Sequence, residues 1–174
     1  ALAAATALAA SLAVPAYAYF QAQPEPEELR FRIPRNLTAE AAETQPGTAP
    51  AFATFSQYDS AISPDGATVA FVARPTTADT FFLYLRPVRS VTPKKIEGTD
   101  DASQPFWSPD NQWVVFFHRP TGKIKRVLAS GGAPQEVGSA PGFQGGSLNA
   151  EGTIIFGSAT GLFQVPAEGG KPVP

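Results

Sequence analysis

The sequence predicts an all-β fold of short antiparallel strands in repeated units, preceded by one apolar helix. A proline–aspartate turn motif recurs at a regular interval, and each copy is followed by β-branched and aromatic residues, which favour strands. The 15 Gly and 18 Pro are spread along the 174 residues, which indicates many short turns between strands.

The turn motif is Ser-Pro-Asp-Gly or a close variant of it. Pro sets φ at the first corner of a type I turn, Asp tolerates the second corner, and Gly accepts the left-handed conformation that closes a hairpin. Asn tolerates that conformation too, whereas the third copy departs further from the motif and predicts a weaker turn. The first two copies are Ser63, Pro64, Asp65 and Gly66, then Ser108, Pro109, Asp110 and Asn111; the third is Asn149 to Gly152.

Strands are predicted on both sides of each turn. The apolar residue before the turn, which is Ile62, Trp107 or Leu148, is expected to pack inward. The run after the turn has the composition of a central strand. Four aromatic residues of these strands are expected in the core: Phe71, Trp107, Phe116 and Phe156.

Further strands complete each unit. A third strand is predicted at 81–85, 123–128 and 162–165, and a short outer strand at 94–97 and 135–137. Ser63 and Ser108 are 45 positions apart, and Asn149 follows Ser108 by 41. A period of roughly 40–45 residues with four short strands is typical of β-propeller blades. The prediction is a partial β-propeller of about three four-stranded antiparallel blades, at 51–102, 103–142 and 143–174.

Residues 1–20 contain no charged residue and are about long enough to cross a hydrocarbon core of roughly 30 Å as a helix. Tyr17, Tyr19 and Phe20 suit a membrane–water interface. We therefore expect residues 1–20 to contact a membrane as a transmembrane anchor. A secretory signal peptide is the alternative, because Ala16-Tyr17-Ala18 resembles a cleavage site, and a buried Ala-rich helix is a third interpretation. The first two place the following residues outside the cytoplasm, either membrane-anchored with a single span or secreted to the periplasm.

Residues 21–50 read as a linker that is acidic and Pro-containing at its start. Within it, residues 29–33 alternate apolar and basic side chains, which predicts a strand that could close the propeller ring. About three blades do not close a ring, since propellers have roughly four to eight. The chain starts at Ala1 without Met and stops within a repeating pattern, so we expect it to be a fragment with blades beyond Pro174.

Composition and single residues argue against several kinds of chemistry. The net charge of −2 gives no basic field for nucleic acid, and the absence of Cys excludes disulfides. His118 is the sole histidine, so a metal site with several histidine ligands is excluded within this chain, and we expect His118 in an exposed turn. Asp100 and Asp101 are expected in a solvated loop. We predict no catalytic, cofactor-binding or metal-binding residue and no cofactor.

The Ser-Pro-Asp-Gly turn, the Val-Ala-Phe-Val strand at 69–72 and the later Gly-Gly-Xaa-Pro turns resemble TolB-like propeller repeats, which are WD-repeat-like. The order of apolar span, acidic spacer, the segment at 28–34 and then blades resembles bacterial eukaryotic-like serine/threonine protein kinases with a TolB-like propeller after a single transmembrane helix. Membrane-bound winged-helix regulators have a similar layout. The kinase resemblance implies a catalytic domain N-terminal to the span, and this chain lacks the kinase motifs.

These features predict a non-catalytic extracytoplasmic module that binds or senses an unknown ligand or protein at the propeller face. Two alternatives stay open at this point. One is a periplasmic scaffold similar to TolB. The other is the gating propeller of a prolyl-oligopeptidase-like hydrolase, which a Gly-Xaa-Ser-Xaa-Gly motif after Pro174 would favour.

Overall fold

The computed structural model describes residues 52–75, 77–90 and 92–174, with side chains from residue 59 onward. These residues belong to one unit of the chain, Pro34–Pro174. The predicted apolar helix at 1–20, the linker at 21–50 and the closing strand at 29–33 lie outside the described residues. Among the residues that are described, no helix has the length and apolar character needed to cross a membrane.

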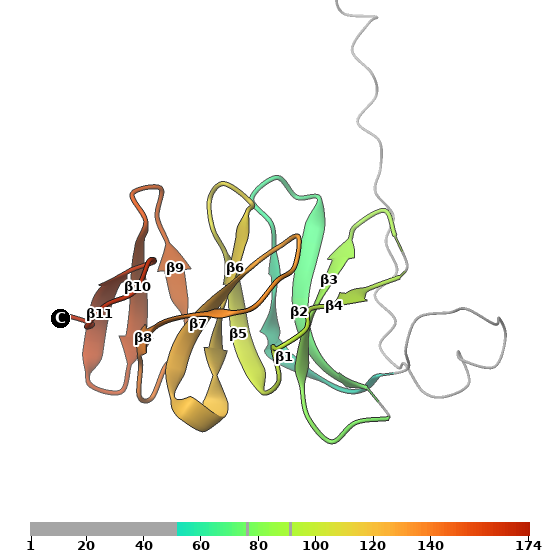
Figure 1. The fold of residues 1–174 in the computed structure, drawn as a ribbon, viewed down its shortest axis with the longest axis horizontal. Coiled ribbons are helices and arrows are strands. Elements are labelled where there is room, and N and C mark those ends of the chain that lie inside the picture. Colours follow the sequence, from blue (N-terminus) through green and yellow to red (C-terminus); the bar gives the residue numbers. More distant parts are fainter. Residues whose placement is uncertain (1–51, 76, 91) are drawn as a thin grey trace, which may run out of the picture. The chain divides into compact units, whose positions relative to one another are not determined.

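The described residues form eleven strands in three antiparallel sheets (Figure 1), as expected for an all-β chain of four-stranded units. In each sheet the spatial order of the strands follows the chain order. Sheet 1 contains β1 (Phe52–Ile62), β2 (Thr68–Pro75), β3 (Phe82–Pro87) and β4 (Lys94–Lys95). Sheet 2 contains β5 (Ala102–Trp107), β6 (Trp113–His118), β7 (Lys123–Leu128) and β8 (Gln135–Ser139). Sheet 3 contains β9 (Gly146–Leu148), β10 (Thr153–Ser158) and β11 (Gly161–Pro166).

Sheet 3 has a single bridge, between Gln164 and Val173, where the other two sheets have their fourth strand. A short 3-10 turn, η2 (Arg119–Thr121), joins β6 to β7. The turn motif joins the first two strands of each sheet. Each recurring hairpin therefore lies within one of three successive sheets of the same design, as the repeat predicted.

Sheet 2 is buried on both faces. Side chains of a strand alternate between the faces of its sheet. On β6, Val114 and Phe116 pack against sheet 1, while Val115 packs against sheet 3, and all three are fully buried. A strand that is covered on both sides needs a continuous apolar run, and this accounts for Trp113 to Phe117. The sheet 1 side chains in the first interface are Ala70, Val72, Leu83, Leu85 and Ile96; the sheet 3 side chains in the second are Leu148, Ile154, Phe156, Val165 and Ala167.

Strand register identifies equivalent positions in the three sheets. Leu83, Ile124 and Leu162 are equivalent, because each lies on the third strand of its sheet and pairs with the same position of the second strand. Leu83 and Ile124 have no exposed surface, because the next sheet covers them, whereas Leu162 is 71% exposed. Ile155 is likewise 48% exposed, although its equivalent Val115 is buried. The outward face of sheet 3 thus has the apolar residues of an interface, and no sheet within the described ranges covers it.

Ile62 differs from the expectation that it packs inward, because 61% of it is exposed. Its equivalents Trp107 and Leu148 are 9% exposed, and each lies against the preceding sheet. Trp107 also donates a hydrogen bond from Nε1 to the carbonyl of Ala61, at 3.2 Å. Within the described residues, sheet 1 has no preceding sheet, so the residue type at this position does not by itself determine burial.

Polar contacts fix sheet 2 on sheet 1. The Asp59 carboxylate is 2% exposed; it accepts the Gln104 N–H at 2.5 Å and lies 3.3 Å from Nη2 of Arg119. At the other end of the interface, Asn111 Oδ1 accepts the Asp65 N–H at 3.1 Å. A buried carboxylate needs such partners to offset its lost hydration. These contacts join residues about one repeat apart and so set the orientation of one sheet on the next.

The equivalence of Ile124 and Leu162 gives a matched test of this packing. We expect Ile124→Ala to lower the free energy of unfolding by about 2–5 kcal/mol, because it removes buried methyl groups and leaves a cavity. Leu162→Ala should change it by less than about 0.5 kcal/mol, because the side chain is exposed. Urea unfolding of the full chain measures both values. Equal losses in the two variants would contradict the assignment of the second interface.

Candidate ligand cleft between sheets 2 and 3

The predicted turn residues form one hydrogen-bonded unit in sheet 1. The Ser63 carbonyl accepts the Gly66 N–H at 2.8 Å, and Gly66 has φ of 71°. The Ser63 hydroxyl donates to Asp65 Oδ1 at 2.5 Å and accepts the Thr68 N–H at 2.9 Å. Asp65 Oδ1 also accepts the Ala67 N–H at 2.9 Å. Serine and aspartate at these positions therefore satisfy backbone groups that a hairpin turn leaves unpaired.

The second copy repeats this unit in sheet 2. The Ser108 hydroxyl donates to Asp110 Oδ1 and accepts the Trp113 N–H at 2.8 Å, while Asp110 accepts the Gln112 N–H at 3.0 Å. Asn111 has φ of 61°, the left-handed conformation expected at the Gly position. Pro64 and Pro109 are exposed at the first corners.

The third copy keeps the turn by another route. Asn149 Oδ1 accepts the Thr153 N–H at 2.7 Å, in the place where the serine hydroxyl accepts in the other copies. Gly152 has φ of 78° and donates its N–H to the Asn149 carbonyl at 3.2 Å. The asparagine amide thus replaces the serine hydroxyl, and this turn closes as the other two do.

Local hydrogen bonds also set the acidity of the turn carboxylates. The Ser63 hydroxyl, and after it the Ala67 N–H, hold the pKa of Asp65 below its ordinary value, because both stabilise the ionised form. The Ser108 hydroxyl and the Gln112 N–H do the same for the pKa of Asp110. Both carboxyls are therefore ionised acceptors at neutral pH.

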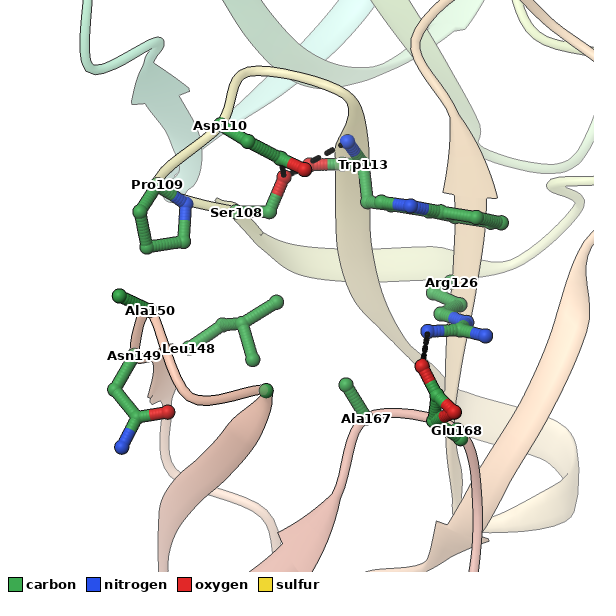
Figure 2. A pocket seen from close by; sticks show the side chains of 11 residues that line it. Ser108, Pro109, Asp110, Trp113, Arg126, Leu148, Asn149, Ala150, Ala167 and Glu168 are labelled. Atoms are coloured by element: carbon green, nitrogen blue, oxygen red, sulfur yellow. Dashed lines mark hydrogen bonds and ion pairs between the residues drawn. The ribbon is translucent and has the colours of Figure 1, made fainter.

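A cleft recurs at the same place in both interfaces, where the turn motif of one sheet faces the next sheet. The first has a volume of about 270 Å³, and its lining includes Asp65, Thr68, Leu85, Lys94 and Trp107. The second, between sheets 2 and 3, is larger at about 380 Å³ (Figure 2). Its lining residues are Ser108, Pro109, Asp110, Trp113, Arg126, Leu148, Asn149, Ala150, Gly152, Ala167 and Glu168.

Two residues of the second cleft depart from the repeat. Register places Trp113 where sheet 1 has Thr68, and Arg126 where sheet 1 has Leu85. The Arg126 guanidinium carbon lies 4.3 Å from the centre of the Trp113 ring, a cation–π contact. The two side chains are diagonal neighbours on β6 and β7 and lie on the face toward sheet 3. The hairpin turn of sheet 1 closes without either residue type, so these two are not required by the turn itself.

Arg126 connects the two walls of the second cleft. Its Nε donates to Gln135 Oε1 of β8 at 3.1 Å, and its Nη1 lies 3.7 Å from Glu168 Oε1 of sheet 3 (Figure 2). The Arg126 side chain is 14% exposed, whereas that of Glu168 is 81% exposed. The turn that carries Glu168 is held on sheet 2 by a hydrogen bond from the Gly170 N–H to the Val137 carbonyl, at 2.9 Å.

The aromatic residues predicted for the core lie in different environments. Phe116 and Phe156 are buried in the first and second interfaces, and Trp107 is 9% exposed. Phe71 is half-buried on the opposite face of sheet 1, where its ring stacks on Tyr84 with 5.6 Å between centroids. None of these four lines the second cleft.

His118 was expected in an exposed turn, and this expectation is wrong. It is the last residue of β6 and is 7% exposed. Its Nδ1 lies 2.7 Å from the Thr121 hydroxyl, and its Nε2 lies 3.8 Å from Asp100 Oδ2. Asp100 is exposed, as expected, but Asp101 is half-buried and accepts a hydrogen bond from Thr80. The η2 turn follows His118, and it forms the tip of the hairpin in place of the histidine.

The sequence reasoning missed Trp113, Arg126 and Glu168 as possible ligand-binding residues. The sequence pattern places Trp113 in the strand after the turn and Arg126 in the third strand of its unit, and neither position indicates binding. Aligning the repeat copies position by position would have identified both residues, because Trp113 replaces Thr68 of the first copy and Arg126 replaces Leu85. No local signal points to Glu168, whose relation to Arg126 depends on how sheet 3 packs on sheet 2.

No protein-family model matches the chain, and no curated protein matches its sequence with significance. Among solved structures, it is similar to the β-propeller domain of the trilobed protease from Pyrococcus furiosus, which has an open velcro topology. That match has a TM-score of 0.53 and 15% identity, and it covers 71% of this chain and 42% of the other. It shows the β-propeller fold.

Two further matches have lower scores. TolB from Acinetobacter baumannii has a TM-score of 0.49 and 18% identity, with 62% of this chain and 29% of the other covered. An acylaminoacyl peptidase from Pyrococcus horikoshii has a TM-score of 0.46 and 19% identity, with 57% and 17% covered. The chain thus spans less than half the length of each of these three structures.

The turn carboxylates predict a specific response to acid. Because the pKa of Asp65 and of Asp110 is lower in the folded state than in the unfolded chain, their ionised forms stabilise the fold above the unfolded value, and this contribution disappears as pH falls through the folded value. Asp65→Asn with Asp110→Asn keeps an acceptor oxygen and removes the titration.

We expect the free energy of unfolding of this double variant to fall less steeply than that of the unchanged protein from about pH 5 to about pH 2. Urea unfolding at a series of pH values measures the slope. Glu151→Gln, an exposed carboxylate in the third turn, is the control. A slope unchanged by the double substitution would show that the turns do not carry this acid dependence.

Proposed function

We propose that this chain is a non-catalytic binding module that holds a segment of another protein in the cleft between sheets 2 and 3. The observation that carries the proposal is the pair Trp113 and Arg126, which departs from the repeat and lines that cleft together. Tryptophan and arginine are the residue types most often found at energetic centres of protein interfaces. A volume of about 380 Å³ is within the usual range for ligand clefts.

The shape and composition of the cleft support a peptide rather than a flat partner surface. Leu148 and Ala167 give it an apolar floor, and its rim is formed by exposed residues of the two turns, which are Pro109, Asp110, Asn149 and Ala150. A side chain inserted against Trp113 would lose contact with water, while the rest of the peptide lies across the turns. Concave sites with an apolar lining and a few polar groups favour such binding.

The location and the wider role are part of the same proposal. Residues 1–20 would anchor the module, with the sheets on the extracytoplasmic side, and occupancy of the cleft would be relayed to a cytoplasmic output. The uncharged character of residues 1–20 supports the anchor. The resemblance to propeller-bearing serine/threonine protein kinases supports a kinase as the output domain. This module would then be the sensing part of that protein, with its catalytic domain elsewhere.

Selection of peptides from a random display library on the full chain tests the binding function. We expect recovered peptides to lose more than about tenfold in affinity with Trp113→Ala, because an aromatic residue at the centre of an interface contributes more than about 1.4 kcal/mol. Fluorescence polarisation with labelled peptides measures the dissociation constants. Urea unfolding of the variant shows whether it is still folded under the binding conditions.

Thr68→Ala is the matched control, because Thr68 has the place of Trp113 in the first cleft. It should leave the affinity unchanged. Recovery of no peptide, or peptides whose affinity depends on Thr68 and not on Trp113, would contradict the proposed function.

A further inference from the structure

The two clefts differ in how their basic residue is paired. In the first cleft, Lys94 Nζ donates to the Ser130 carbonyl at 2.9 Å, so it already has a hydrogen bond to the next sheet. In the second, Arg126 is in contact with Glu168 of the next sheet, but the atoms are 3.7 Å apart, which is longer than a hydrogen bond. Arg126 therefore has an ionic partner across the cleft without a well-formed hydrogen bond to it.

Arg126 has unused capacity to donate. A guanidinium has five N–H donors in a fork that matches a carboxylate. Among the described residues, its one hydrogen bond goes from Nε to Gln135. The side chain is 14% exposed and stacks on Trp113, and no buried side-chain nitrogen in the part of the chain that the structure describes lacks a partner, so water from the cleft reaches these terminal nitrogens when no ligand is bound. The terminal nitrogens thus face the cleft at a point where a strong acceptor would be stabilised.

Glu168 is suited to be displaced. Its side chain is 81% exposed, so on release its carboxylate would exchange a weak contact for full hydration at small cost. Asp110, the other carboxylate that lines the cleft, is engaged in its own turn through Oδ1. The acidic group that lies closest to Arg126 is therefore also the one most easily replaced.

Resting on the binding function proposed above, we infer that the segment bound in this cleft presents a carboxylate to Arg126 and that this carboxylate displaces Glu168. The contact with Glu168 shows that the guanidinium binds a carboxylate at this place. Trp113, Leu148 and Ala167 add an apolar surface beside it. The ligand class is thus an acidic peptide with an apolar or aromatic residue next to the carboxylate. Glu168 acts as an intramolecular competitor for the same position.

The two members of this ion pair should have opposite effects on binding. Arg126→Gln should lower the affinity for an acidic peptide by more than about tenfold, because charge-assisted hydrogen bonds between the guanidinium and the peptide carboxylate are lost. Glu168→Gln should raise the affinity for the same peptide by about two- to fivefold, because it removes a competing carboxylate that is held only by an exposed ion pair. A purely structural ion pair would give weaker binding, or no change, with both substitutions.

Matched controls separate these effects from changes in net charge. Lys94→Gln removes a positive charge from the corresponding part of the first cleft, and Glu97→Gln removes a carboxylate that is 81% exposed, as Glu168 is. Neither should change the affinity. The affinity of each peptide is measured with its acidic side chains intact and again with each of them changed to the amide. It is also measured with the C-terminus free and amidated, which distinguishes a side-chain carboxylate from a terminal one.

The inference holds if the amide form of one carboxylate binds the unchanged protein more weakly and binds Arg126→Gln as tightly as the acidic form does. It is overturned if Arg126→Gln weakens acidic and amide peptides alike, or if Glu168→Gln does not strengthen binding. In both of those results peptides still bind through Trp113, so the proposed function survives. If the full chain selects no peptide at all, the proposed function fails, and this inference fails with it.

Discussion

The fold depends on the burial of both faces of β6 between neighbouring sheets. Val114 and Phe116 on one face and Val115 on the other are fully inaccessible to water. A single repeat unit cannot bury its apolar faces alone, so each sheet is stabilised by the next one. The candidate site follows from this packing. Trp113 and Arg126 lie on the face of sheet 2 that meets sheet 3, at the end where the turns leave a cleft between the two sheets.

The sequence was most informative where structure is determined locally. The turn motif identified the hairpins, because serine, aspartate and glycine each satisfy a requirement of the same few backbone groups. The sequence also predicts the third strand of each unit closely; β7 coincides with the segment predicted at 123–128. The third turn shows the limit of reading by motif, because Asn149 supplies through its amide the acceptor that a serine hydroxyl supplies elsewhere.

Packing between sheets could not be read in this way. Ile62 and Trp107 occupy equivalent positions, but one is exposed and the other buried, because burial here depends on a preceding sheet. His118 was placed at a hairpin tip because Pro and Gly follow it, yet the strand extends through it and the 3-10 turn comes after. The pair of Arg126 and Glu168 joins residues of successive repeats. Its existence depends on how the sheets are stacked, which no local pattern specifies.

The repeat gives the cleft its position, and departures from the repeat give it chemical character. Both interfaces have a cleft beside the turn motif, but only in the second do an aromatic ring and a guanidinium line it together within the described residues. A rigid scaffold of hydrogen-bonded turns around a few distinctive side chains is a common basis for recognition, because little ordering is needed on binding. The predicted turn residues therefore have structural roles, whereas recognition falls to Trp113 and Arg126, which are not part of the turn motif.

The most direct test of this account is an NMR titration of the full chain with a selected peptide, following the Trp113 indole N–H and the Arg126 Nε–H. The account predicts that both signals shift together with the backbone amides of Leu148 and Ala167, while those of Thr68 and Leu85 in the first cleft stay in place. Shifts concentrated in the first cleft, or on the outward face of sheet 3 around Ile155 and Leu162, would contradict the assignment of the site.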